Sequence, residues 1–290
     1  MRVAAVDLGT NTTRLLVADV DGGRVDEIHR ESHVTRLGEG VDARRRLLPL
    51  PIARVRNVLT EYRRTLESLG AERTLAVATS AVRDAENGEA FLGEVEWSYG
   101  FATRLASGDD EAELTRLGVS PPPGALVLDI GGGSTELILD EFHVSLPMGS
   151  VRFTERYGED VDRIGAEARA LLPDLSPRAA VGVAGTVTQL AAFDTDEVHG
   201  FVLTRTRARE QLDLLAGMTV DERRRLPRME PDRAPVIVAG AGILLAVLDA
   251  YGLDAIEVSV RDLLDGVALA AADLPAPVEG DAPPGAYTCC

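Results

Sequence analysis

One pattern occurs twice in the chain, about 120 residues apart, and it restricts the possible folds more than any other feature. Each copy has a short apolar run, an aspartate, a polar turn that contains glycine and hydroxyl residues, and a second apolar run. The copies lie at residues 3–17 and 125–139. Apolar runs of this length are typical of buried strands, so the pattern predicts two strand-turn-strand units in two related domains.

The two turns have the composition of phosphate-binding loops. Glycines carry no side chain, so backbone N–H groups can close around an anion, and the hydroxyls add further donors. Asp7 and Asp129 stand at the tips of the two first strands, where a carboxylate can hold the divalent cation that accompanies a phosphate chain. We expect the loops of the two domains to face each other across a ligand-binding cleft.

The composition excludes several classes of function. The 290 residues suffice for two modest domains with a core each, and a formal net charge of −17 argues against a general nucleic-acid or anionic-membrane surface. All basic residues are arginine, so a catalytic lysine is excluded and a phosphate clamp must use arginine, backbone amides or metal. The two cysteines, Cys289 and Cys290, provide no disulfide framework, and no secretory signal is apparent, which fits a reducing cytoplasm.

The first half of the chain alternates predicted strands and helices. Strands are expected at residues 3–7, 15–20, 25–30, 74–78 and 103–106, with an amphipathic helix at residues 51–69. Residues 36–46 form a polar segment that is either a solvated connection or a lid over the cleft.

A second anion site is predicted at the helix that follows residues 74–78. Ser80 is placed to cap this helix, and Arg83, one turn further on, can reach an anion held at the helix N-terminus. An ordinary cap with a surface arginine is the alternative.

Four carboxylates crowd the first turn of a helix that is predicted to run to about residue 117. They are Asp109, Asp110, Glu111 and Glu113. Acidic residues stabilise helix N-termini, so a solvated face is one interpretation. The other is that one carboxylate, beside bound phosphates, has a raised pKa and serves as a general base. Their spacing alone does not select one of them.

A run of three prolines and a glycine at residues 121–124 predicts the domain boundary. The predicted domains are residues 1–120 and 121–274, followed by a Pro/Gly/Ala-rich tail at 275–290; the last helix can alternatively pack back on the first domain. In domain two, strands are expected at residues 125–128, 136–140, 142–146, 179–184 and 255–260, and helices from residue 148 and at 232–251 and 262–271. A third glycine-and-hydroxyl turn is predicted at residues 185–189, before a helix at 190–193.

The most basic stretch of the chain lies between residues 205 and 228. It contains Arg205, Arg207, Arg209, Arg223, Arg224, Arg225 and Arg228. Some of these side chains can line an approach path for a polyanion, whereas solvated helix faces are the alternative.

Jointly, these motifs resemble the exopolyphosphatase and guanosine pentaphosphate phosphohydrolase family of the actin, Hsp70 and sugar-kinase superfamily. The resemblance covers residues 7–15, 36–40, 78–87, 107–112, 129–137, 147–151, 182–188 and 233–242. It implies the short form of the family, an α/β fold of two ribonuclease H-like (actin-like ATPase) domains with mixed sheets flanked by helices and the active site in the interdomain cleft. One departure is that Asp262 and Leu264 replace a glycine and an arginine, which puts an anion contact there in doubt.

The resemblance also implies roles for single residues. Glu111 would be the catalytic base, and Asp7, Asp129 and Glu136 would bind Mg²⁺ or Mn²⁺, with a monovalent cation such as K⁺ as a further cofactor. The implied phosphate-binding residues are Gly9, Thr10, Asn11, Thr12, Arg14, Ser80, Arg83, Gly131, Gly132, Gly133, Ser134, Gly185 and Thr186. The expected partners are inorganic polyphosphate, guanosine penta- or tetraphosphate as substrate or inhibitor, and a second copy in a homodimer, with no nucleic acid and no membrane.

The expected reaction is hydrolysis of the terminal phosphoanhydride of linear inorganic polyphosphate. Three rivals remain: 5′-phosphate hydrolysis of guanosine pentaphosphate, with a link to the stringent response; an ATP-dependent sugar kinase on the same scaffold; and a non-catalytic polyphosphate or nucleotide sensor. The intact Ser-Gly-x-x-Glu-Ala motif at residues 107–112 argues against the kinase, and the presence of Glu111 argues against the sensor.

Overall fold

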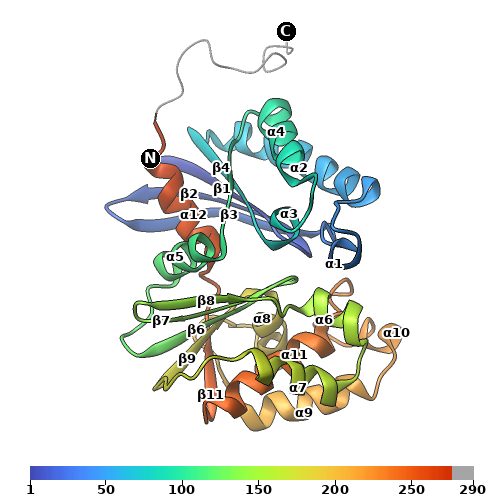
Figure 1. The fold of residues 1–290 in the computed structure, drawn as a ribbon. Helices are drawn as coiled ribbons and strands as arrows, with labels where there is room; N and C mark the ends of the chain where they lie inside the picture. Colours follow the sequence, from blue (N-terminus) through green and yellow to red (C-terminus); the bar gives the residue numbers. More distant parts are fainter. Residues whose placement is uncertain (276–290) are drawn as a thin grey trace. The chain divides into compact units, whose positions relative to one another are not determined.

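The computed structural model describes residues 1–275, which form two compact units (Figure 1). Unit 1 comprises residues 1–118 and the described chain from Leu263 onward, and unit 2 comprises residues 119–262. The chain therefore passes from unit 1 to unit 2 close to the predicted boundary, and its last helix belongs to unit 1. Apart from Pro275, the predicted tail with Cys289 and Cys290 lies outside the described residues.

Unit 1 is built on a five-stranded mixed sheet with the strand order β3-β2-β1-β4-β5. The strands β1, β2 and β3 form the expected antiparallel meander, and β4 and β5 run parallel to β1. The strands are β1 (Arg2–Leu8), β2 (Thr12–Asp21), β3 (Arg24–Val34), β4 (Arg73–Ala78) and β5 (Ala102–Leu105). The helices are α1 (Val41–Arg44), α2 (Pro49–Leu69), α3 (Ser80–Arg83), α4 (Gly88–Tyr99), α5 (Gly108–Val119) and α12 (Leu263–Ala272).

Apolar side chains cover both faces of this sheet. Ala4 and Val6 join the cluster that contains α2 and α4, whereas Val3 and Ala5 join the cluster that contains α12. This division follows from the pleat of β1, which points successive side chains to opposite faces. Leu264 lies in the second cluster and is 1% exposed, so α12 gives the core a side chain where the resemblance led us to expect an arginine.

Unit 2 has a six-stranded mixed sheet with the order β10-β11-β9-β6-β7-β8. Five of its strands, β8-β7-β6-β9-β11, repeat the order and directions of the unit 1 sheet. The strands are β6 (Ala125–Ile130), β7 (Thr135–Leu139), β8 (Phe142–Leu146), β9 (Ala179–Val183), β10 (Val202–Thr204) and β11 (Ala255–Val258). The repeat seen in the sequence is therefore a repeat of a whole sheet, and the predicted fold class is confirmed.

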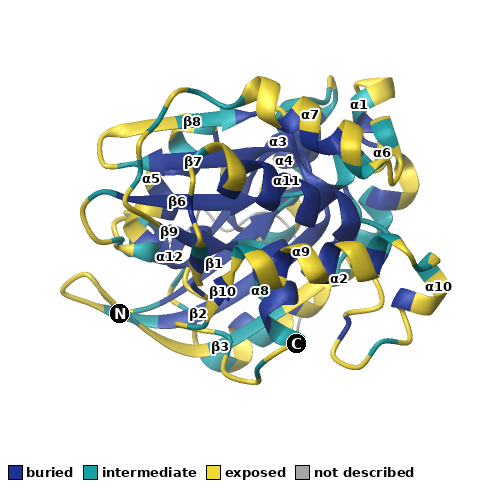
Figure 2. Cartoon of the chain, turned by 90° about the horizontal axis from the view of Figure 1, so that it is seen from below, coloured by how far each residue is buried: buried dark blue, intermediate teal, exposed yellow. Residues whose placement is uncertain are grey.

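Four helices of unit 2, α6, α7, α8 and α9, pack against α11, which is buried from residue 237 to residue 248 (dark blue in Figure 2). Gly240 and Gly242 let its neighbours approach, because a Cβ atom at these positions would lie 2.6 Å from Thr186 Oγ1 and 2.8 Å from Ile164 Cγ2. The helices are α6 (Ser150–Tyr157), α7 (Val161–Leu171), α8 (Ala184–Ala192), α9 (Arg205–Ala216), α10 (Val220–Arg223) and α11 (Ile237–Ala250). Within residues 1–275 no helix is long and apolar enough to cross a membrane.

Two local predictions were wrong, and the helices α1, α4 and α7 and the strand β10 were not predicted. Residues 185–189 are not a separate turn, because α8 begins directly after β9 at Ala184, whose left-handed φ of 62° redirects the chain. Ser80 does not cap α3; the N-cap residue is Thr79, and α3 is a single turn that Ser80 opens.

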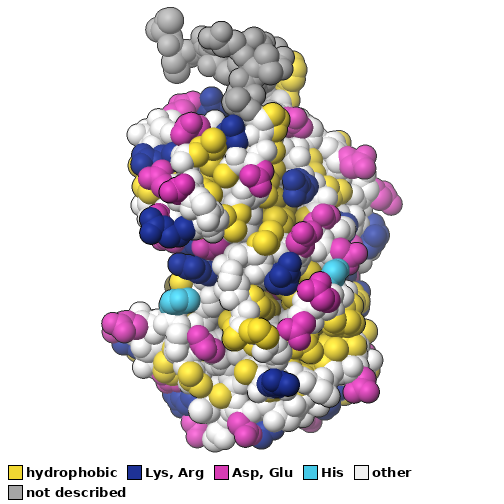
Figure 3. Space-filling view, turned by 90° about the vertical axis from the view of Figure 1, so that its left-hand side faces the viewer, with side chains coloured by type: hydrophobic (Ala, Val, Ile, Leu, Met, Phe, Trp, Pro, Cys, Tyr) yellow, Lys and Arg dark blue, Asp and Glu magenta, His cyan; other side chains and the backbone are white. Residues whose placement is uncertain are grey.

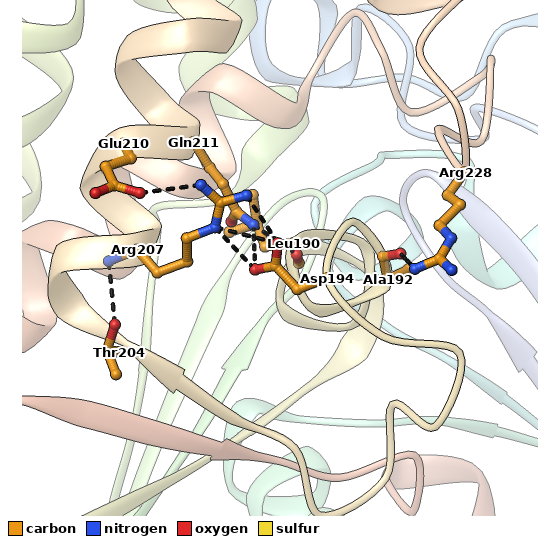
Figure 4. A network of polar contacts seen from close by, with 8 residues as sticks. All are labelled: Leu190, Ala192, Asp194, Thr204, Arg207, Glu210, Gln211 and Arg228. Carbon is orange, nitrogen blue, oxygen red and sulfur yellow. Dashed lines mark hydrogen bonds and ion pairs between the residues drawn. The ribbon is translucent and has the colours of Figure 1, made fainter.

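The arginines between residues 205 and 228 mostly bind acidic side chains of unit 2. Arg207 Nη2 lies 2.7 Å from Asp194 Oδ1 and its Nη1 lies 2.9 Å from Glu210 Oε2, while Gln211 also donates to Asp194 (Figure 4). The pKa of Arg207 is raised, chiefly by the hydrogen bond to Asp194. Arg228 donates to the carbonyl of Ala192 and forms an ion pair with Asp196.

Other arginines of this stretch are paired as well. Arg205 and Arg209 share Asp249, and Arg224 binds Asp221. On the face drawn in Figure 3, acidic and arginine side chains are likewise interspersed rather than separated. These pairs favour a structural role for the stretch over an approach path for a polyanion.

Arg223 is a fully buried arginine at the end of α10. Its Nε donates to Leu215 O at 2.6 Å, its Nη2 donates to Met218 O at 2.7 Å, and the guanidinium binds the carboxylate of Glu159 with two nitrogens. Buried charges are tolerated when each donor finds an acceptor, as here. Arg223 therefore joins three segments of unit 2.

We expect Arg223→Met to lower the free energy of unfolding by about 3 kcal/mol, because it leaves buried carbonyls and Glu159 without their donor. The measurement is chemical denaturation of the full chain. Arg224→Met is the matched control, since Arg224 is exposed and a surface ion pair contributes less than about 1 kcal/mol. Equal losses in the two variants would contradict the structural role of Arg223.

Candidate functional site

In unit 1, the candidate residues follow the carboxyl ends of three parallel strands. The turn at residues 9–12 follows β1, Ser80 and Arg83 follow β4, and Glu111 follows β5. Parallel neighbouring strands end at one edge of a sheet, which is where ligands of α/β proteins bind. The fold therefore brings the predicted base and the predicted phosphate-binding residues of this unit to one edge.

The turn after β1 is a tight loop that the following segment supports. Gly9 N donates to Thr12 O at 3.1 Å, and a Cβ atom at Gly9 would lie 2.8 Å from that oxygen. From the other side, Gly38 N donates to Thr10 O at 2.8 Å. These contacts use carbonyl oxygens of the turn and the N–H of Gly9, so the N–H groups of the residues after Gly9 are what the turn can offer to an anion.

Asp7 lies opposite Arg14 in the β1–β2 pairing and is 4% exposed. Arg14 Nε and Nη2 lie 2.9 Å and 2.8 Å from Asp7 Oδ2. The equivalent pair in unit 2 consists of two carboxylates, because Asp129 faces Glu136 across β6 and β7. A guanidinium thus neutralises the charge of Asp7, whereas two carboxylates face each other at the equivalent position of unit 2.

Glu111 is the buried member of the acidic run, with 6% of its surface exposed, whereas Asp109 and Glu113 are exposed. Arg83 Nη1 donates a hydrogen bond to Glu111 Oε1. It also donates to Ala106 O at 2.7 Å. The guanidinium therefore joins α3 to the end of β5 and the first turn of α5, and it stabilises the ionised carboxylate. Burial and this ion pair distinguish Glu111 from Asp109 and Glu113, whereas the assignment of Glu111 as the base stays a prediction.

Asp110, the neighbour of Glu111, caps α5 together with Ser107. Ser107 Oγ and N donate to Asp110 Oδ2 at 2.6 Å and 2.9 Å, and Asp110 N donates back to Ser107 Oγ at 3.1 Å. The side-chain and backbone hydrogen bonds from Ser107 lower the pKa of Asp110. This reciprocal capping explains one of the four carboxylates without a catalytic role.

We expect Asp110→Ala to lower the free energy of unfolding by about 1 kcal/mol at neutral pH while most of the activity is kept. Because the folded state lowers the pKa of Asp110, the side chain stabilises the folded protein above the ordinary aspartate pKa of about 3.9. This stabilisation is lost as the pH falls through the pKa of Asp110 in the folded state. Unfolding curves of both proteins should therefore converge at acidic pH. A difference that grew on acidification would contradict the capping role.

In unit 2, the turn after β6 repeats the geometry of the first turn. Gly131 N donates to Ser134 O at 3.0 Å, and the start of α6 packs on the turn, with Ser150 N donating to Gly131 O at 2.9 Å. Gly149 allows this approach, because a Cβ atom there would overlap Gly132 O. As in unit 1, neighbouring backbone uses the carbonyl side of the turn.

Asp129 and Glu136 stand at the base of this turn and are 7% and 3% exposed. Ser145 Oγ donates to Glu136 Oε1 at 2.7 Å and orients that carboxylate. Residues 1–275 contain no group of three or more His, Cys, Asp or Glu residues placed to hold a metal ion. Two carboxylates fit Mg²⁺, which takes one or two from a protein and completes its shell with water and substrate phosphates.

The third predicted phosphate site is the N-terminus of α8. Thr186 is 5% exposed and its side chain packs on Gly240 of α11, so its backbone amide is what it can offer a ligand. Gly185 lies beneath the guanidinium of Arg233, with which a Cβ atom would overlap, and Arg233 also binds Glu230. Arg233 was not among the predicted site residues, although it opens the motif at residues 233–242.

Comparison with known proteins assigns the family. The model of the Ppx/GppA phosphatase family matches residues 16–274, which is most of the chain. The chain belongs to the Ppx/GppA phosphatase family. It is 37% identical to "Exopolyphosphatase 2" of Mycobacterium tuberculosis over 317 aligned residues, which cover 93% of this chain and 98% of that protein.

Solved structures agree with this family assignment. The Ppx/GppA enzyme of Aquifex aeolicus is 33% identical, with a TM-score of 0.78 over 93% of this chain and 99% of that one. An exopolyphosphatase of Cytophaga hutchinsonii, 24% identical over 92% and 96% of the two chains, has a TM-score of 0.84 and supports the fold. As a member of the Ppx/GppA family, the chain has an actin-like ATPase fold and is a phosphoanhydride hydrolase. That the loops of both units share one cleft stays a prediction.

Proposed function

We propose that this protein hydrolyses the terminal phosphoanhydride of linear inorganic polyphosphate and releases one orthophosphate in each step. The observation that carries the proposal is Glu111, a buried carboxylate held by Arg83 at the strand edge that also bears a phosphate turn. The relative from M. tuberculosis, which is named an exopolyphosphatase and matches over nearly its whole length, supports polyphosphate as the substrate.

Glu111 has the chemistry of a general base. Its carboxylate takes a proton from a water molecule as the water oxygen bonds to the terminal phosphorus. The bridging P–O bond then breaks, and the shortened polyphosphate leaves with the electron pair of that bond. Arg83 orients Glu111 through the ion pair and presents a guanidinium to the substrate phosphate.

The remaining groups stabilise negative charge. Backbone N–H groups of residues 10–12 and 132–134, with Arg233 at the start of α8, donate to phosphate oxygens. Asp129 and Glu136 would hold Mg²⁺, which when bound neutralises charge on the phosphate oxygens. Asp7, with Arg14 as its partner, fixes the strand end at which the first turn begins.

The decisive experiment is a phosphate-release assay with tripolyphosphate, long polyphosphate, guanosine pentaphosphate and ATP, each with Mg²⁺ and with excess chelator. We expect Mg²⁺-dependent release from polyphosphate above all other substrates. Faster release from guanosine pentaphosphate would assign the alternative activity of the family. Release that required ATP and a sugar acceptor would indicate a kinase, and an absence of release would indicate a sensor.

A further inference from the structure

Three consecutive arginines at the end of α1 make no ion pair with any residue that the structure describes. Arg44, Arg45 and Arg46 are all exposed. Within residues 1–275, none of their side chains forms a salt bridge or hydrogen bond with another residue. The other arginine triplet, residues 223–225, behaves differently, because Arg223 is buried and Arg224 is paired.

The positive charge of the triplet contrasts with the net charge of the chain. The protein has a formal net charge of −17, yet residues 36–46 contain four arginines and two acidic residues. One of those two, Glu39, binds Arg54 of α2 at 2.7 Å. The segment therefore carries local positive charge, which acts within a Debye length of about 8 to 10 Å in ordinary salt.

The backbone ties the triplet to both phosphate-binding elements of unit 1. Upstream, Val41 N donates to Gly38 O, and Gly38 in turn donates to the turn at Thr10. Downstream, Glu86 N donates to Arg45 O at 2.8 Å, three residues after Arg83 of α3. In Figure 1, α1 and α3 lie at the same end of the unit 1 sheet.

The anchoring is rigid. Leu47, the residue after the triplet, is 1% exposed, and its N–H and C=O bind the side chain of Asn87 at 2.8 Å and 3.1 Å. The arginine side chains thus extend into solvent from a fixed backbone between the first phosphate turn and the segment that follows Arg83. Because the backbone is already anchored, binding of a polyanion needs to order only the three side chains.

We propose that Arg44, Arg45 and Arg46 bind the part of a long polyphosphate chain that lies beyond its reacting end. The proposal rests on the proposed function, and it places the polyanion contact at α1 rather than at residues 205–228. Phosphates spaced along a flexible chain suit three guanidinium groups that have no ion-pair partner among residues 1–275, because guanidinium groups bind phosphate oxygens in a forked geometry. Chains too short to reach the triplet would not gain from it.

The test replaces all three arginines with glutamine and measures kcat/KM for long polyphosphate and for tripolyphosphate. We expect the ratio of the two values to fall about tenfold at low salt. Binding is measured in a Glu111→Gln background, which prevents hydrolysis. There, the slope of log Kd for long polyphosphate against log salt concentration should become shallower by about 2, because three phosphate contacts to a single-stranded polyanion contribute about that much to the slope. Because this binding measurement needs no turnover, it separates the proposal from the proposed function.

The matched control replaces Arg64, Arg104 and Arg116 with glutamine. These residues are also exposed arginines of unit 1 without an ion pair within the described chain, but they lie on three different elements, α2, β5 and α5. The net charge changes equally in both variants. The proposal would be overturned if both triple variants had the same ratio of kcat/KM values and the same salt dependence of log Kd. It would also be overturned if the triplet bound a single-stranded oligonucleotide as strongly as long polyphosphate.

A single variant guards against misfolding as the cause of a weaker affinity. Arg45 has a left-handed backbone with φ of 52°, a conformation that glycine adopts without strain. We expect Arg45→Gly to keep or raise the melting temperature while it weakens binding of long polyphosphate. Unchanged affinity in a stably folded Arg45→Gly, together with an unchanged triple variant, would contradict the proposal.

Discussion

Replacing Glu111 with glutamine is expected to lower kcat on polyphosphate by about 10² to 10⁴, the typical loss for a general base. Glutamine keeps the shape of the side chain and can still accept the hydrogen bond from Arg83, but it cannot take the proton from water. Substrate binding and melting temperature should therefore change little. The measurement is a steady-state phosphate-release assay beside thermal unfolding of the same preparation.

The acidic neighbours of Glu111 provide the controls. Asp109→Asn and Glu113→Gln change exposed carboxylates of the same helix turn, so each should keep most of the activity. If Glu111→Gln retains more than about a tenth of the wild-type kcat, well short of the expected loss, Glu111 is not the base. Glu136 would then be the first carboxylate to examine.

Asp129→Asn is expected to reduce turnover at least about 100-fold, because a bound cation stabilises the transition state by several kcal/mol and about 1.4 kcal/mol corresponds to a factor of ten. The variant should also need more Mg²⁺ for half-maximal rate. A readout without turnover is the rise in melting temperature on Mg²⁺ addition, which should shrink in Asp129→Asn.

Asp7→Asn is the informative comparison, because the equivalent aspartate of unit 1 faces Arg14 instead of a carboxylate. Its main effect should be a lower free energy of unfolding, by about 1.5 to 3 kcal/mol, from the loss of a buried charged hydrogen bond. If Asp7→Asn raises the Mg²⁺ requirement as much as Asp129→Asn does, both aspartates bind the metal. If neither variant does so, the proposed metal-binding residues are wrong.

The internal repeat could be recognised from sequence because its signal is local. An apolar strand, an aspartate, a glycine turn and a second apolar strand lie within about a dozen residues, so residue order alone predicts their geometry. The structure confirms it with the same hydrogen bond in both copies, Gly9 to Thr12 and Gly131 to Ser134. The strands β1 and β2 and the strands β6 and β7 follow from this pattern for the same reason.

Local signals also failed in one informative place. Glycine and hydroxyl residues at 185–189 were interpreted as a turn by analogy with the other two sites. In the structure they are the first turns of α8, because Gly185 and Thr186 provide space for Arg233 and for α11, which come from distant parts of the chain. Small residues permit a turn and a close helix contact alike, and only packing distinguishes them.

The role of each charged side chain was decided by the tertiary structure. Arg83 reaches Glu111 across 28 positions and Arg223 reaches Glu159 across 64, whereas Arg44, Arg45 and Arg46 meet no acidic partner within the described residues. The sequence by itself determined the repeated sheets, the motif residues and the family. Charge interactions act through space rather than along the chain. Which strand ends lie side by side therefore decides whether a carboxylate is buried beside a guanidinium or exposed to solvent.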